Sequence, residues 1–341
     1  MITSIEIERL RGIESGKLEG LTPLTVLVGP NGSGKSTVLD ALLIGASPVI
    51  GDAIGRAVRR RSSQTNGLPW LVHRRGSAGA ACIRLHTDVV DYRVCTLSVT
   101  PTSVPQESRI NWATEQFNHA LGQPMQHEGA VRWKWDTDRA EYVYDGGDLT
   151  ARHVAEGLDA RLVNCELERD QPPLHDLFSR ARQEGRKEAA LAALSSLVPG
   201  LEQVEILTDE GRPGLSLSFP DRAVPAEVAG DGIRSLLRTC LECAARPRGL
   251  VLIEEPEVHQ HPAAIRQTAR VLLETVKRGV QVVATTHSIE LIDFLLDACG
   301  EADLPLLLVI RVVLRDGRLL SSAWSGGDAA ALRRDIYEDL R

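Results

Sequence analysis

The sequence predicts an α/β fold with a mixed sheet, and three observations support this. A buried strand at 24–28 leads through a glycine-rich loop into a helical pattern that runs to about residue 44. Two further apolar runs, 249–253 and 280–284, each end in polar residues, as parallel strands buried on both faces do. Strand-like alternation at 2–10 and several runs between 81 and 144 add an N-terminal antiparallel β lobe and an inserted α+β middle region.

The composition is typical of a globular chain. The 341 residues are 43% hydrophobic and 25% charged, and no window of 18 apolar residues exists. The first residues lack the basic and apolar regions of a signal peptide, so we expect a cytoplasmic protein without a membrane segment. Because the net charge is −7, any nucleic-acid surface must be a local patch.

The loop after the first buried strand carries the strongest motif. Residues 29–36 fit G-x-x-x-x-G-K-[ST] at every fixed position, between a strand and a helix. Its glycines let backbone N–H groups surround phosphate oxygens. Lys35 is expected to reach the β- and γ-phosphates of ATP, Ser36 to bind Mg²⁺, and Thr37 to support the α-phosphate. The predicted nucleotide-binding residues are Gly29, Pro30, Asn31, Gly32, Ser33, Gly34, Lys35, Ser36 and Thr37.

A basic segment follows. The pattern predicts a helix over 48–61, and residues 53–87 contain no Asp or Glu. Such a segment fits contact with DNA or RNA phosphates, but arginines paired internally with carboxylates are the more frequent outcome. Gln64 is a weak candidate for a Mg²⁺-sensing glutamine. The arginines concerned are Arg56, Arg59, Arg60, Arg61, Arg74 and Arg75.

The middle of the chain gives weaker signals. Strands are predicted at 81–86 and 89–99, whereas 100–127 is rich in Pro, Gln, Ser and Asn and predicts a loop. Trp133 and Trp135 share a strand face, which favours core packing over base stacking. Two helical stretches, at 174–184 and 186–198, are too short for a coiled-coil arm.

The second half supplies acidic and histidine residues at strand ends. The run 249–253 ends in Glu254 and Glu255, and the run 280–284 is followed by His287. In a phosphate-loop NTPase one carboxylate holds the Mg²⁺ shell and the next polarises the attacking water. Gly230, Asp231 and Gly232 open a further helix, whose N-terminus is suited to an anion.

Together these motifs resemble ABC-type P-loop ATPases of the RecF, SMC and OLD kind, often described as AAA-family ATP-binding proteins. The resemblance implies that residues 29–37 are Walker A, 250–254 Walker B, 230–232 the signature loop that contacts the γ-phosphate of the partner subunit, and 257–262 the D-loop. It also implies that Glu255 is the catalytic glutamate and His287 the switch histidine, with Lys35 as the third catalytic residue and Ser36 and Glu254 as metal ligands.

Two departures from the family pattern bear on rate. Glu254 stands where Asp is usual, which lengthens the side chain toward Mg²⁺. Ala229 and Gly230 stand where a serine is common, which removes a hydroxyl donor. We therefore expect an active but slow ATPase.

Other motifs favour structural roles. Cys240 and Cys243 form a lone C-x-x-C on a helical face, where packing is favoured over a zinc or redox site. His259 and His261 form an H-x-H motif in the expected D-loop turn. A structural role in the turn before a helix is favoured over metal binding. The C-terminal part of the sequence predicts two edge strands, 306–315 and 318–324, and a helix over 329–340.

The whole therefore predicts one ATPase domain, 1–341, with an insertion at 90–225. The short stretch after His287 leaves no room for the nuclease domain that OLD-type proteins often carry, so a nuclease is expected only as a separate partner. We expect an ATP-sandwiched homodimer that drives or gates a nucleic-acid or effector-protein partner, of the genome-maintenance or phage-defence type. The alternative is an ATP-dependent dimerisation switch without hydrolysis. A transporter subunit is disfavoured by the long, strand-rich stretch between Lys35 and Gly230.

Overall fold

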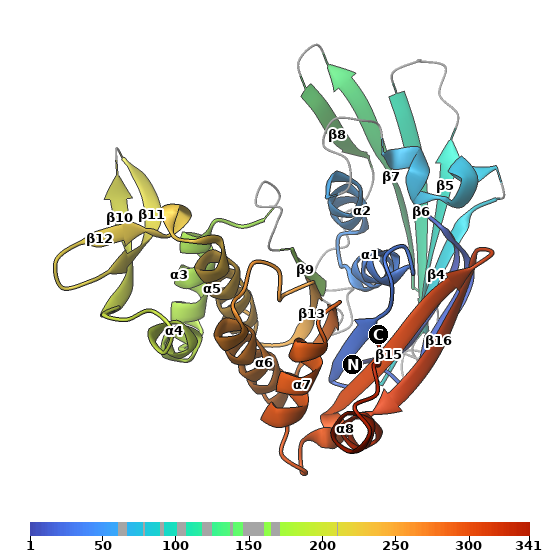
Figure 1. The fold of residues 1–341 in the computed structure, drawn as a ribbon. Coiled ribbons are helices and arrows are strands. Elements are labelled where there is room, and N and C mark those ends of the chain that lie inside the picture. The colour runs from blue at the N-terminus through green and yellow to red at the C-terminus, as the bar shows by residue number, and fades with distance from the viewer. Residues whose placement is uncertain are drawn as a thin grey trace. The chain divides into compact units, whose positions relative to one another are not determined.

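The computed structural model describes residues 1–60, 67–77, 79–88, 92–100, 107–117, 125–136, 139–145, 160–164, 171–209 and 211–341. The chain divides into two compact units (Figure 1). The first comprises Met1–Thr22, Val28–Leu162 and Ile310–Ala323, and the second Pro23–Leu27, Val163–Val309 and Trp324–Arg341.

The first unit is built on strands that are mostly antiparallel, in the order β8-β7-β6-β5-β4-β1-β2-β16-β15. Strand β16 is the exception, because it runs parallel to β2. The elements are β1 (Ile2–Leu10), β2 (Ile13–Glu19), α1 (Lys35–Ala46), α2 (Ile50–Arg59), β4 (Ala81–Thr87), β5 (Tyr92–Thr100), β6 (Glu107–Phe117), β7 (Met125–Asp136), β8 (Arg139–Asp145), β15 (Leu307–Arg315) and β16 (Arg318–Ser325).

Helices α1 and α2 cover one face of this antiparallel region (Figure 1). Strand β4 shows the resulting period of two, since Ala81, Ile83 and Leu85 are fully buried. The helix approaches so closely that a Cβ on Gly45 would lie 2.9 Å from the Leu85 side chain. The face opposite is more polar, as expected for an antiparallel sheet covered on one side.

The second unit contains strands in the order β15-β3-β14-β13-β9, of which β3, β14 and β13 are parallel, and a separate antiparallel sheet, β10-β11-β12. Strands β3, β13 and β14 are buried along nearly their whole length, which explains their continuous apolar sequences. The elements are β3 (Leu24–Val28), β9 (Ala160–Asn164), α3 (Leu174–Gln183), α4 (Lys187–Ser195), β10 (Gln203–Asp209), β11 (Arg212–Ser218), β12 (Ala223–Pro225), α5 (Asp231–Ala244), β13 (Gly249–Glu254), α6 (Pro262–Lys277), β14 (Val280–Thr285), α7 (Ile289–Ala298) and α8 (Gly326–Asp335).

Helices α3, α4 and α5 lie together next to the small sheet (Figure 1). They share one apolar cluster with it. Its centre includes Leu194, Leu215, Leu237 and Leu241, all fully buried. Cys240 belongs to this cluster and Cys243 is also buried, so the C-x-x-C residues have a packing role, and burial raises the pKa of the Cys240 thiol.

The prediction of a mixed α/β fold with an N-terminal antiparallel region is confirmed, but three details are wrong. The segment predicted as loop, 100–127, contains β6 and the start of β7. Strand β6 buries Ile110, Trp112, Thr114 and Gln116 on one face. Because half of these buried residues are polar, the sequence lacks the apolar–polar alternation that predicts a strand.

The predicted edge strands near the end of the chain lie inside the strand order instead. Strand β16 lies between β2 and β15, and pairs Leu319 with Gly16. A Cβ on Gly16 would lie 2.5 Å from the Leu319 Cβ, so this glycine permits the pairing. The final helix, α8, ends at Asp335, five residues before the predicted end. None of the described helices is long and apolar enough to cross a membrane.

Candidate functional site

The predicted phosphate loop, Gly29–Ser36, connects β3 to α1. Gly29, Gly32 and Gly34 have φ values of +140°, +77° and +95°, which L side chains rarely adopt. A Cβ on Gly29 would lie 2.3 Å from the Val312 carbonyl oxygen, so that position excludes a side chain as well. The loop therefore has the backbone conformation that glycine alone supplies.

The Lys35 side chain is hydrogen-bonded to the backbone of this loop. Its Nζ donates hydrogen bonds to the carbonyl oxygens of Gly29, at 2.7 Å, and Pro30, at 3.2 Å. No side chain caps the N-terminus of α1, and its first turn carries no acid, so the positive end of the helix is available to an anion. The buried Ser33 hydroxyl has no hydrogen-bond partner among the described residues. These features fit a bound phosphate chain.

A buried carboxylate supports the helix that follows the loop. Asp40, on α1, is completely buried, with Arg60 Nε 2.6 Å from Oδ1 and Arg11 Nε 2.8 Å from Oδ2. Arg60 also donates to the carbonyl oxygen of Ser36, at 2.7 Å. Its side chain is only 5% exposed, so Arg60 belongs to this internal network, as the favoured interpretation of internally paired arginines predicts, and it is not part of a nucleic-acid surface.

The other predicted arginines differ in environment. Arg56 pairs with Asp52 on α2, at 2.8 Å. Arg74 and Arg75 are exposed and have left-handed backbone conformations, and the Arg75 guanidinium lies 5.3 Å from the ring centre of Trp70, which is 60% exposed. Arg61 and Gln64 lie outside the described residues, as do the side chains of Trp133 and Trp135.

In the second unit, the ends of β13 and β14 bring two predicted catalytic residues together. The parallel register pairs Glu254 with Thr285, so the next residues of both strands leave the same edge. Glu255 Oε1 lies 3.3 Å from His287 Nε2, and the two side chains are 36% and 35% exposed. Glu255 has a φ of +47°, a strained conformation for a non-glycine residue. A partly exposed carboxylate–imidazole pair can orient a water and accept its proton.

Glu257 is a residue whose role the sequence did not reveal. Its Oε1 accepts hydrogen bonds from the Thr286 hydroxyl, at 2.6 Å, and from the His287 backbone N–H, at 2.9 Å. Its Oε2 is buried and has no hydrogen-bond partner among the described residues. The only sequence signal was a third acid in the run that follows β13. We refer to Glu254, Glu255, Glu257 and His287 as the acidic cluster.

The predicted signature loop begins α5, with Gly230 as the N-cap residue. A Cβ on Gly232 would lie 2.7 Å from the His259 carbonyl oxygen, so a glycine is required for the approach of this loop to the turn after β13. Asp231, in the first turn, lies 3.3 Å from the Arg234 guanidinium. That carboxylate makes this helix start less suited to an anion than the start of α1.

The H-x-H motif has a structural explanation. His261 Nδ1 accepts a hydrogen bond from the Ala263 N–H, at 3.2 Å, and Pro262 occupies the first turn of α6. His261 is thus the N-cap of α6. Among the described residues, no group of three or more His, Cys, Asp or Glu side chains is placed to hold a metal ion.

Comparison with known proteins matches this chain to a family. The family described as "AAA domain, putative AbiEii toxin, Type IV TA system" matches residues 24–80 and 159–293, more than half of the chain. An uncharacterized protein of Methanocaldococcus jannaschii, MJECL11, is 36% identical over 114 residues, which are 33% of this chain and 98% of that protein. The OLD nuclease of Thermus scotoductus is 25% identical over 327 residues and 84% of this chain, which spans 59% of the nuclease's length.

A solved structure shows the same fold. It is the Smc head domain with an extended coiled coil bound to the C-terminal domain of ScpA, derived from Pyrococcus furiosus. The match has a TM-score of 0.50 at 15% identity and covers 99% of both chains.

Proposed function

We propose that this chain, which belongs to the family described as "AAA domain, putative AbiEii toxin, Type IV TA system" and resembles ATPases of the RecF/SMC/OLD type, binds ATP with Mg²⁺ and hydrolyses it. The observation that carries hydrolysis is the pairing of Glu255 with His287 at the aligned ends of β13 and β14, with Glu255 in a strained backbone conformation.

Each residue has a proposed role. The backbone of residues 29–34 surrounds the phosphates, and Lys35 exchanges its carbonyl partners for β- and γ-phosphate oxygens. Ser36 and Glu254 would hold Mg²⁺, which supplies neutralisation of phosphate charge when bound. Glu255 orients a water for attack on the γ-phosphate and accepts its proton, and His287 holds the Glu255 carboxylate in place.

We also propose that two copies sandwich two ATP molecules. In this arrangement Gly230–Gly232 of one copy contacts the γ-phosphate bound by the other, as the family resemblance implies. The close approach of Gly232 to the His259 carbonyl supports this role, because it fixes the signature loop against the turn that follows the acidic cluster. We further propose a single ATPase domain with an insertion at 90–225. The family match leaves residues 81–158 uncovered, which supports the first part of this insertion, whereas residues 159–225 are included in the match.

For the partner, we propose a nucleic acid or an effector protein in a defence or genome-maintenance pathway. The names of the matched family and of the Thermus relative refer to a toxin–antitoxin system and a nuclease. An exposed tryptophan beside two exposed arginines, Trp70 with Arg74 and Arg75, supports a nucleic-acid contact, because bases stack on aromatic rings and phosphates attract guanidinium groups.

Steady-state phosphate release tests the hydrolysis proposal. Glu255→Gln should lower kcat at least about 100-fold while nucleotide binding is retained, because only the base is lost. Lys35→Ala should lose binding itself. Size measurement in ATP·Mg²⁺ should show a dimer that Glu255→Gln stabilises. Equal turnover by wild type and Glu255→Gln would refute the catalytic assignment.

A second candidate is an ATP-dependent dimerisation switch without turnover. Two features favour it, namely Glu254 in place of Asp and the absence of a serine at Ala229 and Gly230. This reading predicts that wild type dimerises with ATP·Mg²⁺ but releases no phosphate above a Lys35→Ala control, and that Glu254→Asp gains turnover.

A further inference from the structure

The peptide groups of His287 are held from both sides by charged side chains. Its N–H donates to Glu257 Oε1, at 2.9 Å, and its carbonyl oxygen accepts from Arg341 Nη1, at 3.2 Å. Hydrogen bonds to charged groups are stronger than those between neutral groups. Residue 287 is therefore fixed at both its amide and its carbonyl, beside the Glu255 carboxylate that its imidazole contacts.

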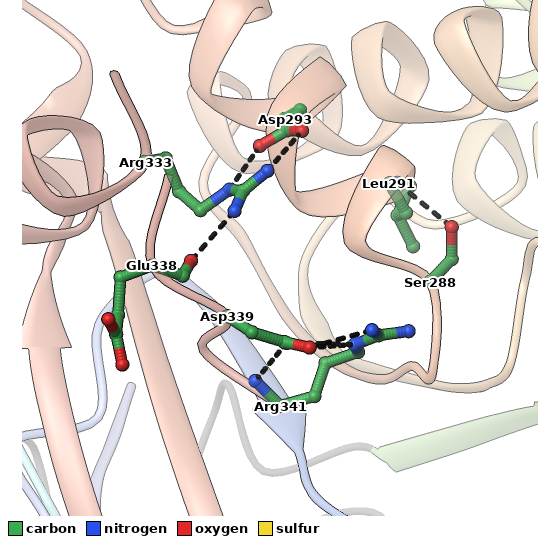
Figure 2. A network of polar contacts seen from close by, with 7 residues as sticks. All are labelled: Ser288, Leu291, Asp293, Arg333, Glu338, Asp339 and Arg341. Atoms are coloured by element: carbon green, nitrogen blue, oxygen red, sulfur yellow. Dashed lines mark hydrogen bonds and ion pairs between the residues drawn. The ribbon is translucent and has the colours of Figure 1, made fainter. Parts of the chain in front are cut away.

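Arg341 is itself held in one orientation (Figure 2). The Asp339 carboxylate accepts from Arg341 Nε, at 2.9 Å, from Nη2, at 2.7 Å, and from the Arg341 backbone N–H, at 3.0 Å. The residue between them, Leu340, is completely buried. A long, flexible side chain is thus directed toward the His287 carbonyl by a local pair and a buried anchor.

The segment that carries Arg341, residues 336–341, is fastened to the helix that follows His287. Arg333, on α8, makes two bonds to the Asp293 carboxylate on α7, at 2.7 and 2.9 Å, and donates to the Glu338 carbonyl oxygen, at 2.7 Å (Figure 2). The Ser288 hydroxyl caps α7 by accepting from the Leu291 N–H, at 3.2 Å. Arg333 therefore ties segment 336–341 to α7, the helix that follows His287.

We infer that Arg341 is a positioning residue for ATP hydrolysis, which fixes the His287 peptide so that the imidazole stays beside Glu255. The inference rests on the proposed function for its catalytic readout. It makes segment 336–341 part of the working site, although Arg341 acts through the His287 backbone and not on the substrate. Small displacements of a catalytic group lower rates strongly, so the effect should appear in kcat.

The test compares Arg341→Ala with Arg341→Lys, which keeps a charged donor, and with Arg334→Ala as a matched control. Arg334 donates to the Leu296 carbonyl near the other end of α7. Arg341→Ala should lower kcat roughly tenfold with KM for ATP unchanged, because a partly exposed charged hydrogen bond is lost. Arg341→Lys should restore most of kcat, and Arg334→Ala should match wild type.

A second readout does not need turnover. In protein labelled with ¹³C at histidine Cε1, the His287 signal, assigned by its loss in His287→Gln, should shift or broaden in Arg341→Ala but not in Arg334→Ala. An unchanged kcat and an unchanged His287 signal in Arg341→Ala would each overturn the inference. If wild type and Glu255→Gln show equal turnover, the hydrolysis proposal fails, and the histidine signal alone then decides whether Arg341 positions His287.

Discussion

The phosphate loop and the acidic cluster place their functional groups in opposite ways. The loop uses consecutive residues, and its shape comes from glycine backbone and from Lys35 bonded to loop carbonyls. The acidic cluster uses side chains from separate segments, joined by hydrogen bonds at partly exposed strand ends. Changes at the loop should therefore cost stability, whereas changes at the cluster should alter turnover while the fold persists.

Asp40→Asn should have the largest effect, because it leaves the Arg11 and Arg60 guanidiniums without a buried counter-charge. We expect the free energy of unfolding to fall by about 3–5 kcal/mol. Urea denaturation measures it, with Asp52→Asn as the control, since that acid makes a half-exposed pair with Arg56 worth about 0.3–0.5 kcal/mol. Equal losses in the two variants would show that the buried network does not support the loop.

Gly29→Ala and Gly32→Ala separate close contact from backbone strain within the loop. Both residues have positive φ, but only the Gly29 Cβ would meet an atom, the Val312 carbonyl oxygen at 2.3 Å, while nothing lies within 4 Å of a Gly32 Cβ. Gly29→Ala should cost about 2–4 kcal/mol of stability and Gly32→Ala about 1 kcal/mol. Thermal unfolding measures the difference in stability between the two variants. Equal losses of stability would mean that backbone strain alone, and not the contact with Val312, explains why glycine is needed at residue 29.

Glu257→Gln tests the acidic cluster, where we expect an effect on turnover rather than on stability. Glutamine keeps an acceptor for Thr286 and His287 but loses the charge that strengthens both bonds. We expect kcat to fall roughly tenfold, with nucleotide affinity unchanged and stability lowered by no more than about 1 kcal/mol. Glu274→Gln, on the exposed face of α6 beside Lys277, is the control. A loss of stability without loss of kcat would assign Glu257 a structural role.

The same contrast explains what the sequence could predict. The loop motif is contiguous, so its residues and its strand–helix context were readable, and the buried strands placed Glu254, Glu255 and His287 at strand ends. The contacts of Glu257 and Arg341 join segments far apart in the chain and leave no local pattern. The pairing of β16 with β2 and the polar inward face of β6 were missed for the same reason, since each depends on packing.

The smallest expected effect is a pH dependence of the free energy of unfolding, caused by Asp339, which bonds to Arg341 next to the acidic cluster. The Arg341 guanidinium and N–H, bonded to the Asp339 carboxylate, lower the pKa of Asp339 to about 2. A carboxyl whose pKa is lower in the folded than in the unfolded chain stabilises the fold above its unfolded value, about 3.9, and loses that contribution as pH falls toward 2. Because both side chains are about half exposed, solvent screening limits the contribution to a few tenths of a kcal/mol. Urea unfolding of wild type and Asp339→Asn should therefore differ slightly at pH 6 and converge near pH 2. A difference that grows as the pH falls would contradict this sign and remove Asp339 as the group that orients Arg341.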